Sequence, residues 1–394
     1  MSPSDYIELH ARSGFSFLRG ASLPEQLAES AAAAALPAFA LCDRMGVYGA
    51  PRFFSAARSA GVRPIIGAEL VLEDASILPV LVESQTGYRN LCRLLTQAHL
   101  RAPKGEGRVR WNELPEFASG LVALTGDSSG PLIRALLQPR TQRLSAEQSS
   151  PTACLDRLVQ TFGAGNVFVE LQRHLTRDED RIVRSLVDLA RDRNVPLLAT
   201  NGVLHATPVG RPVLDVFTCL RHHTHLDAAG RWLALNAECH VKTAGQMRAL
   251  FIDLPESILN TRRLADRLQF SLKDLGYEFP RYPVGPSETM EQVLEAQASA
   301  GASNRYPDGI PDKVRALLRK ELALIHKLGF SGYFLIVADL VRFCRKQNIL
   351  AHARQHRSSR AAYRFFWQQF RVGLPPIQFN DAGAQLQLRG LRRV

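Results

Sequence analysis

The first 205 residues alternate β-rich runs with helical patterns, and this alternation limits the fold more than any other feature. Strand–helix alternation at this spacing is typical of α/β proteins with a mainly parallel sheet or barrel. Helices are predicted between the strands, most clearly at 23–35, 87–100 and 178–193. The predicted strands are 6–10, 38–42, 63–72, 77–82, 121–125, 167–171 and 197–200.

Composition narrows the class of protein. At 394 residues the chain is long enough for two or three domains. The apolar fraction of 46% and the charged fraction of 22% exclude a disordered or fibrous protein. Six cysteines without a CxxC pair exclude a disulfide scaffold and a zinc ribbon. The longest strongly apolar run, 333–338, is too short for a bilayer and no secretory signal is visible, so we expect a soluble cytoplasmic protein without membrane contact.

A proline-rich segment marks the expected domain boundary. Three prolines fall within 280–286 and break any regular element there. They are expected to separate a first domain, 1–279, from a linker and helical segment at 280–350. In that second segment, apolar stripes predict helices at 312–328 and 332–345.

The excess of positive charge lies at the C-terminal end. Eleven of the 49 basic residues but only one of the 37 acidic residues lie in 342–394, and the rest of the chain is nearly neutral. A basic segment attracts nucleic-acid phosphates, which makes Arg354, Arg357 and Arg360 weak candidates for nucleic-acid binding. The shift toward Arg, Gln and Ala near 351 is also typical of out-of-frame translation. We therefore expect 351–394 to be a divergent basic tail, either frameshifted or disordered.

Imidazole and carboxylate side chains follow several predicted strands. The loops at the carboxyl ends of strands surround one crevice in a barrel or doubly wound sheet. Neutral nitrogens and anionic oxygens gathered there are what a hydrolytic metal site needs. The candidates are His10, Asp43, Glu69, Glu170 and His174.

Two arginines argue against a metal ion at these strand ends. Arg12 stands where a second histidine would complete an HxH pair, and Arg44 follows Asp43 directly. A guanidinium group does not lose its proton in a protein, so it cannot be a ligand and repels a cation. We expect Arg12 and Arg44 to pair with Asp43 and Glu69, replacing the metal's charge with guanidinium.

Other possible sites are weaker. His222, His223 and His225 resemble a metal cluster, but neighbours in sequence seldom face one point, and a solvated turn is the simpler interpretation. Asp178 and Asp180 open a predicted helix, where acidic residues complement the helix dipole. The absence of GxxxxGK[ST], GxGxxG and GxSxG motifs argues against P-loop, Rossmann and α/β-hydrolase chemistry.

Long ordered motifs carry a resemblance to a known family. They include ELHARSGFSFLRGAS (8–22), LCDRMGVYGAPRF (41–53), RPIIGAELVLED (63–74), DVFTCLRHHTHLDAAGR (215–231) and ELALIHKLGFSGYFLIVADLVRFCRKQNIL (321–350). From residue 6 to about 350 the chain resembles the N-terminal part of the bacterial error-prone DNA polymerases, which belong to the C family. The resemblance implies a PHP (polymerase and histidinol phosphatase) domain with a distorted (β/α)7 barrel, followed by a partial helical segment of the polymerase palm.

The resemblance also implies a site pattern. Metal-binding PHP domains use an HxH pair, a DH pair, a Glu, further His residues and a terminal DxH pair. His10, Asp43, Glu69 and His174 match this pattern, whereas Arg12, Arg44, Gly202 and Leu204 replace ligands. The family comparison therefore predicts a degenerate PHP site with no metal or other cofactor, and neither phosphoesterase nor proofreading activity.

For the whole polymerase, the resemblance implies two-metal nucleotidyl transfer with Mg²⁺, DNA and dNTPs in translesion synthesis, DNA repair and damage-induced mutagenesis. The family's Gly-Arg-Gly-Ser turn and PDxD-type motif do not occur in 351–394, so we expect a fragment that does not polymerise by itself. Other translesion-synthesis proteins and the sliding clamp are expected partners of parts missing here. A metal-dependent PHP phosphoesterase and a non-catalytic module for nucleic acid or a polymerase partner remain alternatives.

Overall fold

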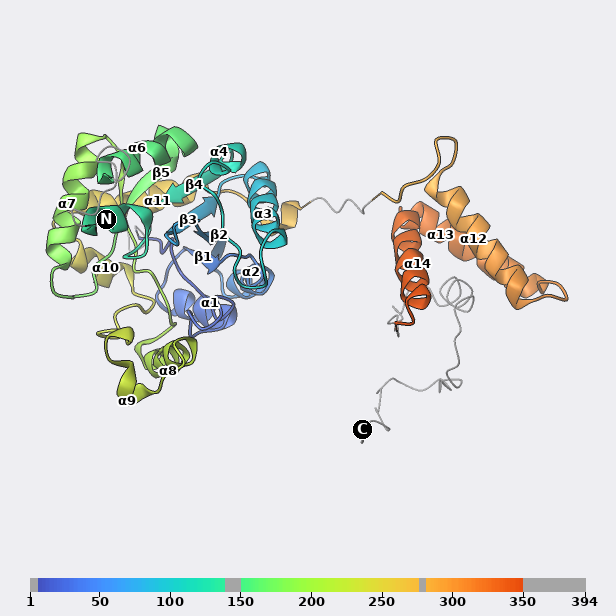
Figure 1. Cartoon of the computed structure of the whole chain (residues 1–394), viewed down its shortest axis with the longest axis horizontal. Coiled ribbons are helices and arrows are strands. Elements are labelled where there is room, and N and C mark those ends of the chain that lie inside the picture. Colours follow the sequence, from blue (N-terminus) through green and yellow to red (C-terminus); the bar gives the residue numbers. More distant parts are fainter. Residues whose placement is uncertain (1–5, 139–149, 276–280, 350–394) are drawn as a thin grey trace. The chain divides into compact units, whose positions relative to one another are not determined.

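The computed structural model describes residues 6–138, 150–275 and 281–349. The chain divides into two compact units, Met1–Leu275 and Gly276–Val394 (Figure 1). The predicted basic tail 351–394, with Arg354, Arg357 and Arg360, lies outside the described residues, as does the start of the proline-rich linker.

In the described part of the first unit, six strands form one sheet in the order β1-β2-β3-β4-β5-β6. They are β1 (Ala38–Arg44), β2 (Arg63–Val71), β3 (Ile77–Val82), β4 (Leu121–Leu124), β5 (Val167–Leu171) and β6 (Leu197–Ala199). β3 pairs antiparallel with β2 and β4, and the other neighbours pair parallel. The connection from β2 to β3 is only 72–76, which is too short for the crossover that a parallel pair requires.

Both faces of the sheet are apolar, and the sheet curls into a half-barrel (Figure 1). Along β1, Ala38, Ala40 and Cys42 belong to the inner core, while Phe39 and Leu41 belong to the outer core beneath the helices. This alternation follows the strand period of two. The inner core also contains Ile7, Leu9, Ile65, Leu81, Val122, Leu124, Phe168 and Leu198.

The segment before β1 connects the two edges of the sheet. Glu8 forms an isolated parallel bridge to Phe39 in β1, and Ala11 forms one to Val203 beyond β6. The segment thus stands where a seventh strand would close the barrel.

The prediction of a regular strand at 6–10, and with it seven strands, is wrong in this detail. The N–H of Ile7 donates to Thr261 Oγ1 at 3.0 Å. The N–H of His10 donates to the Glu8 carboxylate at 2.9 Å. Because side chains accept these main-chain donors, a continuous ladder does not form.

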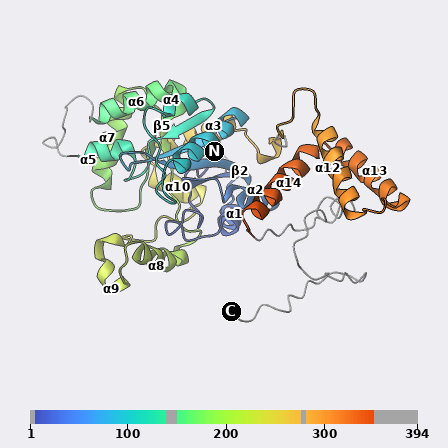
Figure 2. The ribbon, with the colours of Figure 1, turned by 45° about the vertical axis from the view of Figure 1, so that its right-hand side comes forward.

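Helices cover the outer face of the sheet (Figure 2). They are α1 (Pro24–Ala33), α2 (Ala50–Ser59), α3 (Gln85–Leu100), α4 (Leu114–Phe117), α5 (Pro131–Leu137), α6 (Pro151–Phe162) and α7 (Glu179–Asp192). The Ser84 side chain caps α3 by accepting from the N–H of Gly87. The buried face of α3 carries the predicted stripe of Leu91, Leu94, Leu95 and Ala98.

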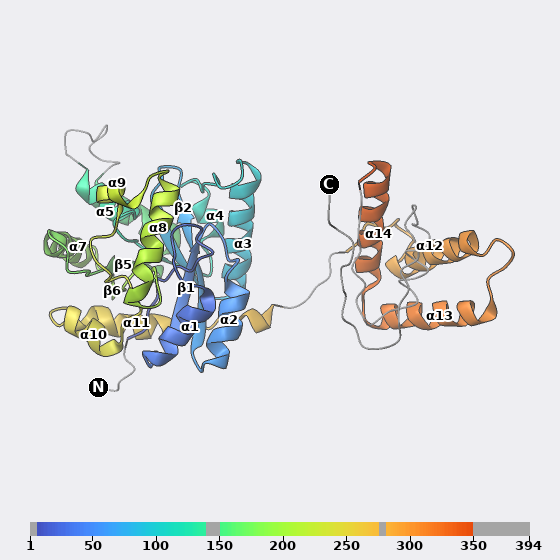
Figure 3. The same ribbon diagram turned by 90° about the horizontal axis from the view of Figure 1, so that it is seen from below.

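The described residues 211–267 contain four further α-helices: α8 (Arg211–Arg221), α9 (Leu226–Ala229), α10 (Ala244–Leu250) and α11 (Pro255–Arg267). α8 and α9 stand at the periphery of the first unit in Figure 1. α11 closes the amino-terminal end of the half-barrel (Figure 3), where Arg63 at the start of β2 donates to the carbonyl groups of Ala265 and Leu268. The carboxyl ends of β1 and β2 are therefore left for the site.

The described part of the second unit is helical. It contains α12 (Met290–Arg305), α13 (Asp312–Lys327) and α14 (Ser331–Lys346), which share a small core around Leu294, Ile325 and Leu335. Within the described residues, no single helix has the length and apolarity to cross a membrane. The consecutive pair α13 and α14, bent by 112°, meets that test together by length and composition only.

Candidate functional site

Glu69 is the centre of the candidate site. It lies near the carboxyl end of β2 with a fully buried side chain. Three basic side chains surround it: His10 Nε2 at 2.8 Å, Arg12 Nε at 2.7 Å and Arg44 Nε at 3.0 Å. The Arg44 contact is a hydrogen bond, whereas the Arg12 Nε contact is an ion pair whose N–H is not aligned for one. A single carboxylate thus holds both predicted guanidinium groups.

His10 bridges two carboxylates. Its Nδ1 lies 2.7 Å from Glu170 Oε1 at the end of β5, and its Nε2 lies 2.8 Å from Glu69 Oε1. Burial favours the neutral ring, but Glu170 and Glu69 outweigh it and raise the pKa of His10 from 6.5 to about 10. The imidazole is therefore protonated at neutral pH, with both nitrogens acting as donors.

The charges around Glu69 compensate one another. Burial disfavours its charged form, but Arg12, Arg44 and His10 hold the pKa of Glu69 well below its usual range. Arg12 also donates from Nη2 to Asp127 Oδ2 at 2.6 Å. Despite burial, the acidic groups raise the pKa of Arg12 above its ordinary value. The site is thus a closed network of charges inside the protein.

Asp43 is placed differently from the prediction. Its carboxylate accepts from the Ser13 N–H at 2.8 Å, from Ser13 Oγ at 2.8 Å and from Ser16 Oγ at 2.8 Å. Burial raises the pKa of Asp43 although these donors counteract it. The expected pairing of the arginines with Asp43 is therefore wrong, because serines satisfy this carboxylate and Asp127 takes its place.

His174 does not join the Glu69 network. Its Nε2 donates to the carbonyl of Asn201 at 2.9 Å. Gly202, with a left-handed φ of +56°, leaves space that the Gln172 amide fills: a Cβ built on Gly202 would lie 2.6 Å from Gln172 Nε2. Leu204 is partly buried and offers no ligand atom. At the terminal DxH positions, the Gln172 amide fills the space beside Gly202, and position 204 carries the alkyl side chain of leucine.

These residues do not fit a metal ion. Both ring nitrogens of His10 face carboxylates at hydrogen-bond distance, and two guanidinium groups lie against Glu69. A metal cation placed there would be repelled by the Arg12 and Arg44 guanidinium groups, which offer no lone pair for coordination. Across residues 6–138, 150–275 and 281–349, no group of three or more His, Cys, Asp or Glu could hold a metal.

The weaker histidine candidates have local roles. His222 stacks on Trp232 with ring centroids 4.0 Å apart, and exposed His223 lies in the turn after α8. Two histidines outside the predicted candidates also have main-chain partners: His205 Nδ1 lies 2.8 Å from the carbonyl of Thr207. His99 Nε2 lies 2.7 Å from the carbonyl of Met45.

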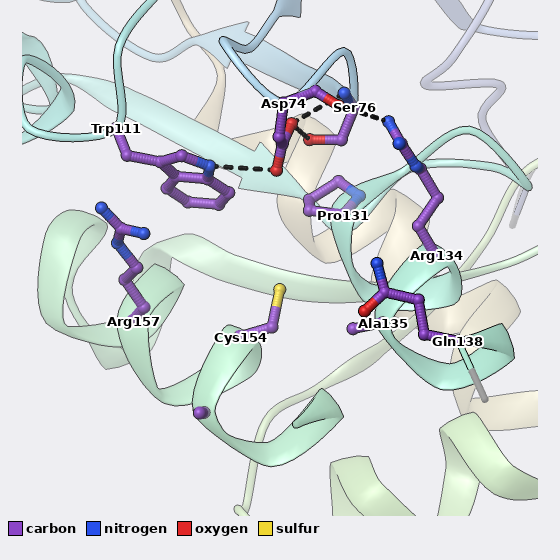
Figure 4. Close-up of a pocket in the computed structure, with 10 residues that line it drawn as sticks. Asp74, Ser76, Trp111, Pro131, Arg134, Ala135, Gln138, Cys154 and Arg157 are labelled. Carbon is purple, nitrogen blue, oxygen red and sulfur yellow. Dashed lines mark hydrogen bonds between the residues drawn. The ribbon is translucent and has the colours of Figure 1, made fainter. Parts of the chain in front are cut away.

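One cavity lies apart from the Glu69 network. It has a volume of about 180 Å³, and side chains from the 74–76 loop, α5 and α6 line it (Figure 4). Asp74 accepts from Trp111 Nε1 at 3.2 Å, and the Arg157 guanidinium covers the Trp111 ring at 4.4 Å from its centroid. None of the predicted site residues lines this cavity.

Sequence reasoning missed three members of the site. Asp127 follows β4 within three residues, so the rule that selected the other strand-end groups could have found it. Gln172 follows β5, but nothing in its sequence context shows that it would fill the space beside Gly202. Glu8 is buried and accepts from Tyr6, His10 and Asn201, which requires the folded structure to see.

Comparison with known proteins identifies similar families and relatives. The PHP domain family matches residues 8–174, and the family described as the bacterial DNA polymerase III alpha NTPase domain matches residues 292–363. The error-prone DNA polymerase of Caulobacter vibrioides is 35% identical over 355 residues, covering 90% of this chain and 31% of the relative. That of Rhodopseudomonas palustris is 35% identical over 393 residues, covering 90% of this chain and 34% of the relative. Over 90% of its length, the chain is similar to error-prone DNA polymerases.

The chain spans about a third of the length of the error-prone polymerases it matches. Residues 8–174 of the half-barrel unit match the PHP domain family, as the sequence resemblance implied. Solved structures align more loosely: PsfC from Pseudomonas syringae covers 66% of this chain and 97% of its own, with 11% identity and a TM-score of 0.30. Similarity at that level says nothing about activity.

Proposed function

We propose that the PHP domain of this chain is a structural scaffold of an error-prone DNA polymerase and performs no metal-dependent hydrolysis. One observation carries the proposal: Glu69, which the resemblance assigns as a ligand, is bound by Arg12 and Arg44 instead. Guanidinium groups supply fixed positive charge but cannot activate a water molecule as a metal does. The network ties the segment before β1 to the ends of β1, β2 and β5, which is a structural role.

The whole polymerase, in this proposal, joins dNTPs to a primed DNA template with Mg²⁺ during translesion synthesis and DNA repair. The relatives named error-prone DNA polymerase support DNA and nucleotides as substrates, and a cytoplasmic location is part of the same proposal. Other translesion-synthesis proteins and the sliding clamp are proposed partners of regions beyond those described. Mg²⁺ would supply charge stabilisation to the transferring phosphoryl group.

Within residues 281–349, the described part of the second unit, no group of three or more His, Cys, Asp or Glu could hold a metal ion. Asp339 in α14 accepts from the Tyr282 hydroxyl at 2.7 Å and is also bonded to Arg342. Asp339 is thus engaged by the Tyr282 hydroxyl and the Arg342 guanidinium, and it holds the linker against α14. We therefore propose that nucleotidyl transfer depends on groups outside residues 281–349.

Primer extension tests the polymerase part of the proposal. The full chain is incubated with primed template, Mg²⁺ and all four dNTPs, and we expect no incorporation above a protein-free blank. Asp339→Asn is the matched variant. Incorporation by the full chain that disappears in this variant would overturn the assignment.

Hydrolysis of p-nitrophenyl phosphate with added Mn²⁺ tests the scaffold part. We expect the same rate with the full chain as without protein. Manganese-dependent turnover that is lost in Glu69→Gln but kept in Glu116→Gln, an exposed residue on α4, would show that the PHP site is a phosphoesterase.

A further inference from the structure

The cavity between the 74–76 loop, α5 and α6 is a separate place where a ligand can bind, and we call it the α5–α6 pocket. It lies in the helical layer, and Trp111 in its wall belongs to the outer core beneath the helices. In Figure 4, Trp111 and Arg157 stand on one side of the pocket and Arg134 on the other. A cavity of roughly 150 Å³ holds a benzene molecule. With about 180 Å³, the pocket therefore has room for a small organic molecule.

The carboxylate in the pocket wall is satisfied by the protein itself. Asp74 Oδ1 accepts from the N–H and the Oγ of Ser76 at 2.8 and 2.5 Å, and Asp74 Oδ2 accepts from Trp111 Nε1 at 3.2 Å. Arg134 donates from Nη1 to the Asp74 carbonyl at 2.9 Å. Burial disfavours the charged carboxylate, but the bonds from Ser76 and Trp111 and the charge of Arg134 hold the pKa of Asp74 below its ordinary value. Asp74 thus stays ionised and balances Arg134.

Arg157 is a cation of the pocket wall without an acidic partner among the described residues. Its guanidinium carbon lies 4.4 Å from the centroid of the Trp111 ring, so the indole fixes its position. Within 6–138, 150–275 and 281–349, Arg157 forms no ion pair, and the neighbouring Asp156 pairs with Arg193 at 2.9 Å instead. A guanidinium group that stacks on a ring uses its face, and its N–H groups point outward in its own plane. These donors are therefore left for a ligand.

Small side chains of low polarity form the rest of the wall. Pro131 and Ala135 come from α5, and Ala153 and Cys154 come from α6. Burial and the charge of Asp74 raise the pKa of Cys154 to about 12, so its thiol stays neutral and acts as a small apolar group. An inorganic anion would leave this surface in contact with water, whereas an acid with an apolar body would cover it.

We propose that the α5–α6 pocket binds a small organic acid of about the size of benzoate, whose carboxylate pairs with Arg157 and whose apolar body covers Pro131, Ala135 and Cys154. A guanidinium group offers two parallel N–H donors to a planar carboxylate. One carboxylate would also balance the charge of Arg157. This binding role goes beyond the scaffold proposed above, does not involve the Glu69 network and needs neither hydrolysis nor polymerisation.

Binding of benzoate to the full chain tests the proposal. Titration followed by saturation-transfer difference NMR gives the Kd of benzoate and of benzamide, which has the same shape without the charge. Benzamide should bind about tenfold more weakly, because it lacks one charge-assisted contact. Arg157→Gln should weaken benzoate about tenfold and leave benzamide unchanged. Arg191→Gln is the matched control, since Arg191 is exposed on α7 and does not line the pocket.

A second variant tests the location of the ligand. Cys154→Phe places an aromatic ring in the pocket and should remove benzoate binding. Because a ligand that binds only the folded state stabilises it, benzoate should raise the Tm of the wild type and of Arg191→Gln but not that of Cys154→Phe. Thermal unfolding without benzoate checks folding: Arg157 is exposed, so Arg157→Gln should unfold at the same temperature as the wild type.

Four results would overturn the proposal. The first is the absence of any saturation transfer from the wild type to benzoate. The second is an equal Kd of benzoate for the wild type, Arg157→Gln and Arg191→Gln, and the third is benzamide binding as tight as that of benzoate. The fourth is inorganic phosphate that displaces benzoate with a lower Kd, since the pocket would then select an anion without an apolar body.

Discussion

Arg12 Nε lies 2.7 Å from Glu69 Oε1, with both side chains almost completely removed from solvent. Removing one partner from a buried ion pair leaves a charge without compensation, and this costs more than the intact pair contributes. Glu69 compensates Arg44 and His10 as well as Arg12. The stability of the carboxyl ends of β1 and β2 therefore depends on a single carboxylate.

Substitution of that carboxylate should be strongly destabilising. Glu69→Gln keeps the shape but leaves three cations facing one another, and we expect it to lower the free energy of unfolding by about 3–5 kcal/mol. Urea unfolding followed by circular dichroism measures the change. Glu116→Gln, an exposed residue on α4, is the control and should change stability by less than about 0.5 kcal/mol.

Stability should fall in mildly alkaline solution. The folded-state pKa of His10 is about 10, above the ordinary 6.5, so its contribution is complete below pH 6.5 and disappears as the pH rises through 10. His174 adds to the slope: burial lowers its pKa, but Cys239, the Asn201 carbonyl and Glu179 raise it to about 9. Unfolding midpoints measured across this range should decrease.

The variant His10→Asn should make that pH dependence shallower, and His223→Asn, in the exposed turn after α8, should leave it unchanged. A pH profile that is identical in the wild type and His10→Asn would show that His10 is not held as a cation by Glu69 and Glu170.

A side chain at position 202 should be costly. Gly202→Ala places a Cβ 2.6 Å from Gln172 Nε2 and forces a left-handed φ of +56°, and we expect a loss of about 1–3 kcal/mol. In the double variant with Gln172→Ala the steric part disappears, so the two changes should be non-additive. Additive losses would indicate that Gln172 does not fill the space beside Gly202.

The sequence predicted the element types well and their pairing less well. The apolar run 38–42 indicated a buried strand but not which side chains face the inner core, because both faces of β1 are buried. The antiparallel direction of β3 could have been predicted, since the connection 72–76 cannot form a crossover. The bridge between Ala11 and Val203 could not, because the two residues lie far apart in the sequence.

For the candidate site, the residue types in the sequence indicated that no metal binds, but the sequence did not show which side chains pair with one another. Arginine at positions 12 and 44 was enough to argue against a metal, since a guanidinium group cannot ligate. Which carboxylates these arginines bind depends on the curl of the sheet, which brings Asp127 to Arg12 and leaves Asp43 to the serines of the 13–19 loop.

Metal content measures the central claim most directly. The full chain, purified without chelator and then dialysed with excess Zn²⁺ or Mn²⁺ before removal of free ions, is analysed by inductively coupled plasma mass spectrometry. With Arg12 and Arg44 bound to Glu69, we predict far less than one equivalent of either metal and no change in Glu69→Gln. One or more equivalents retained by the wild type and lost in Glu69→Gln would contradict the account.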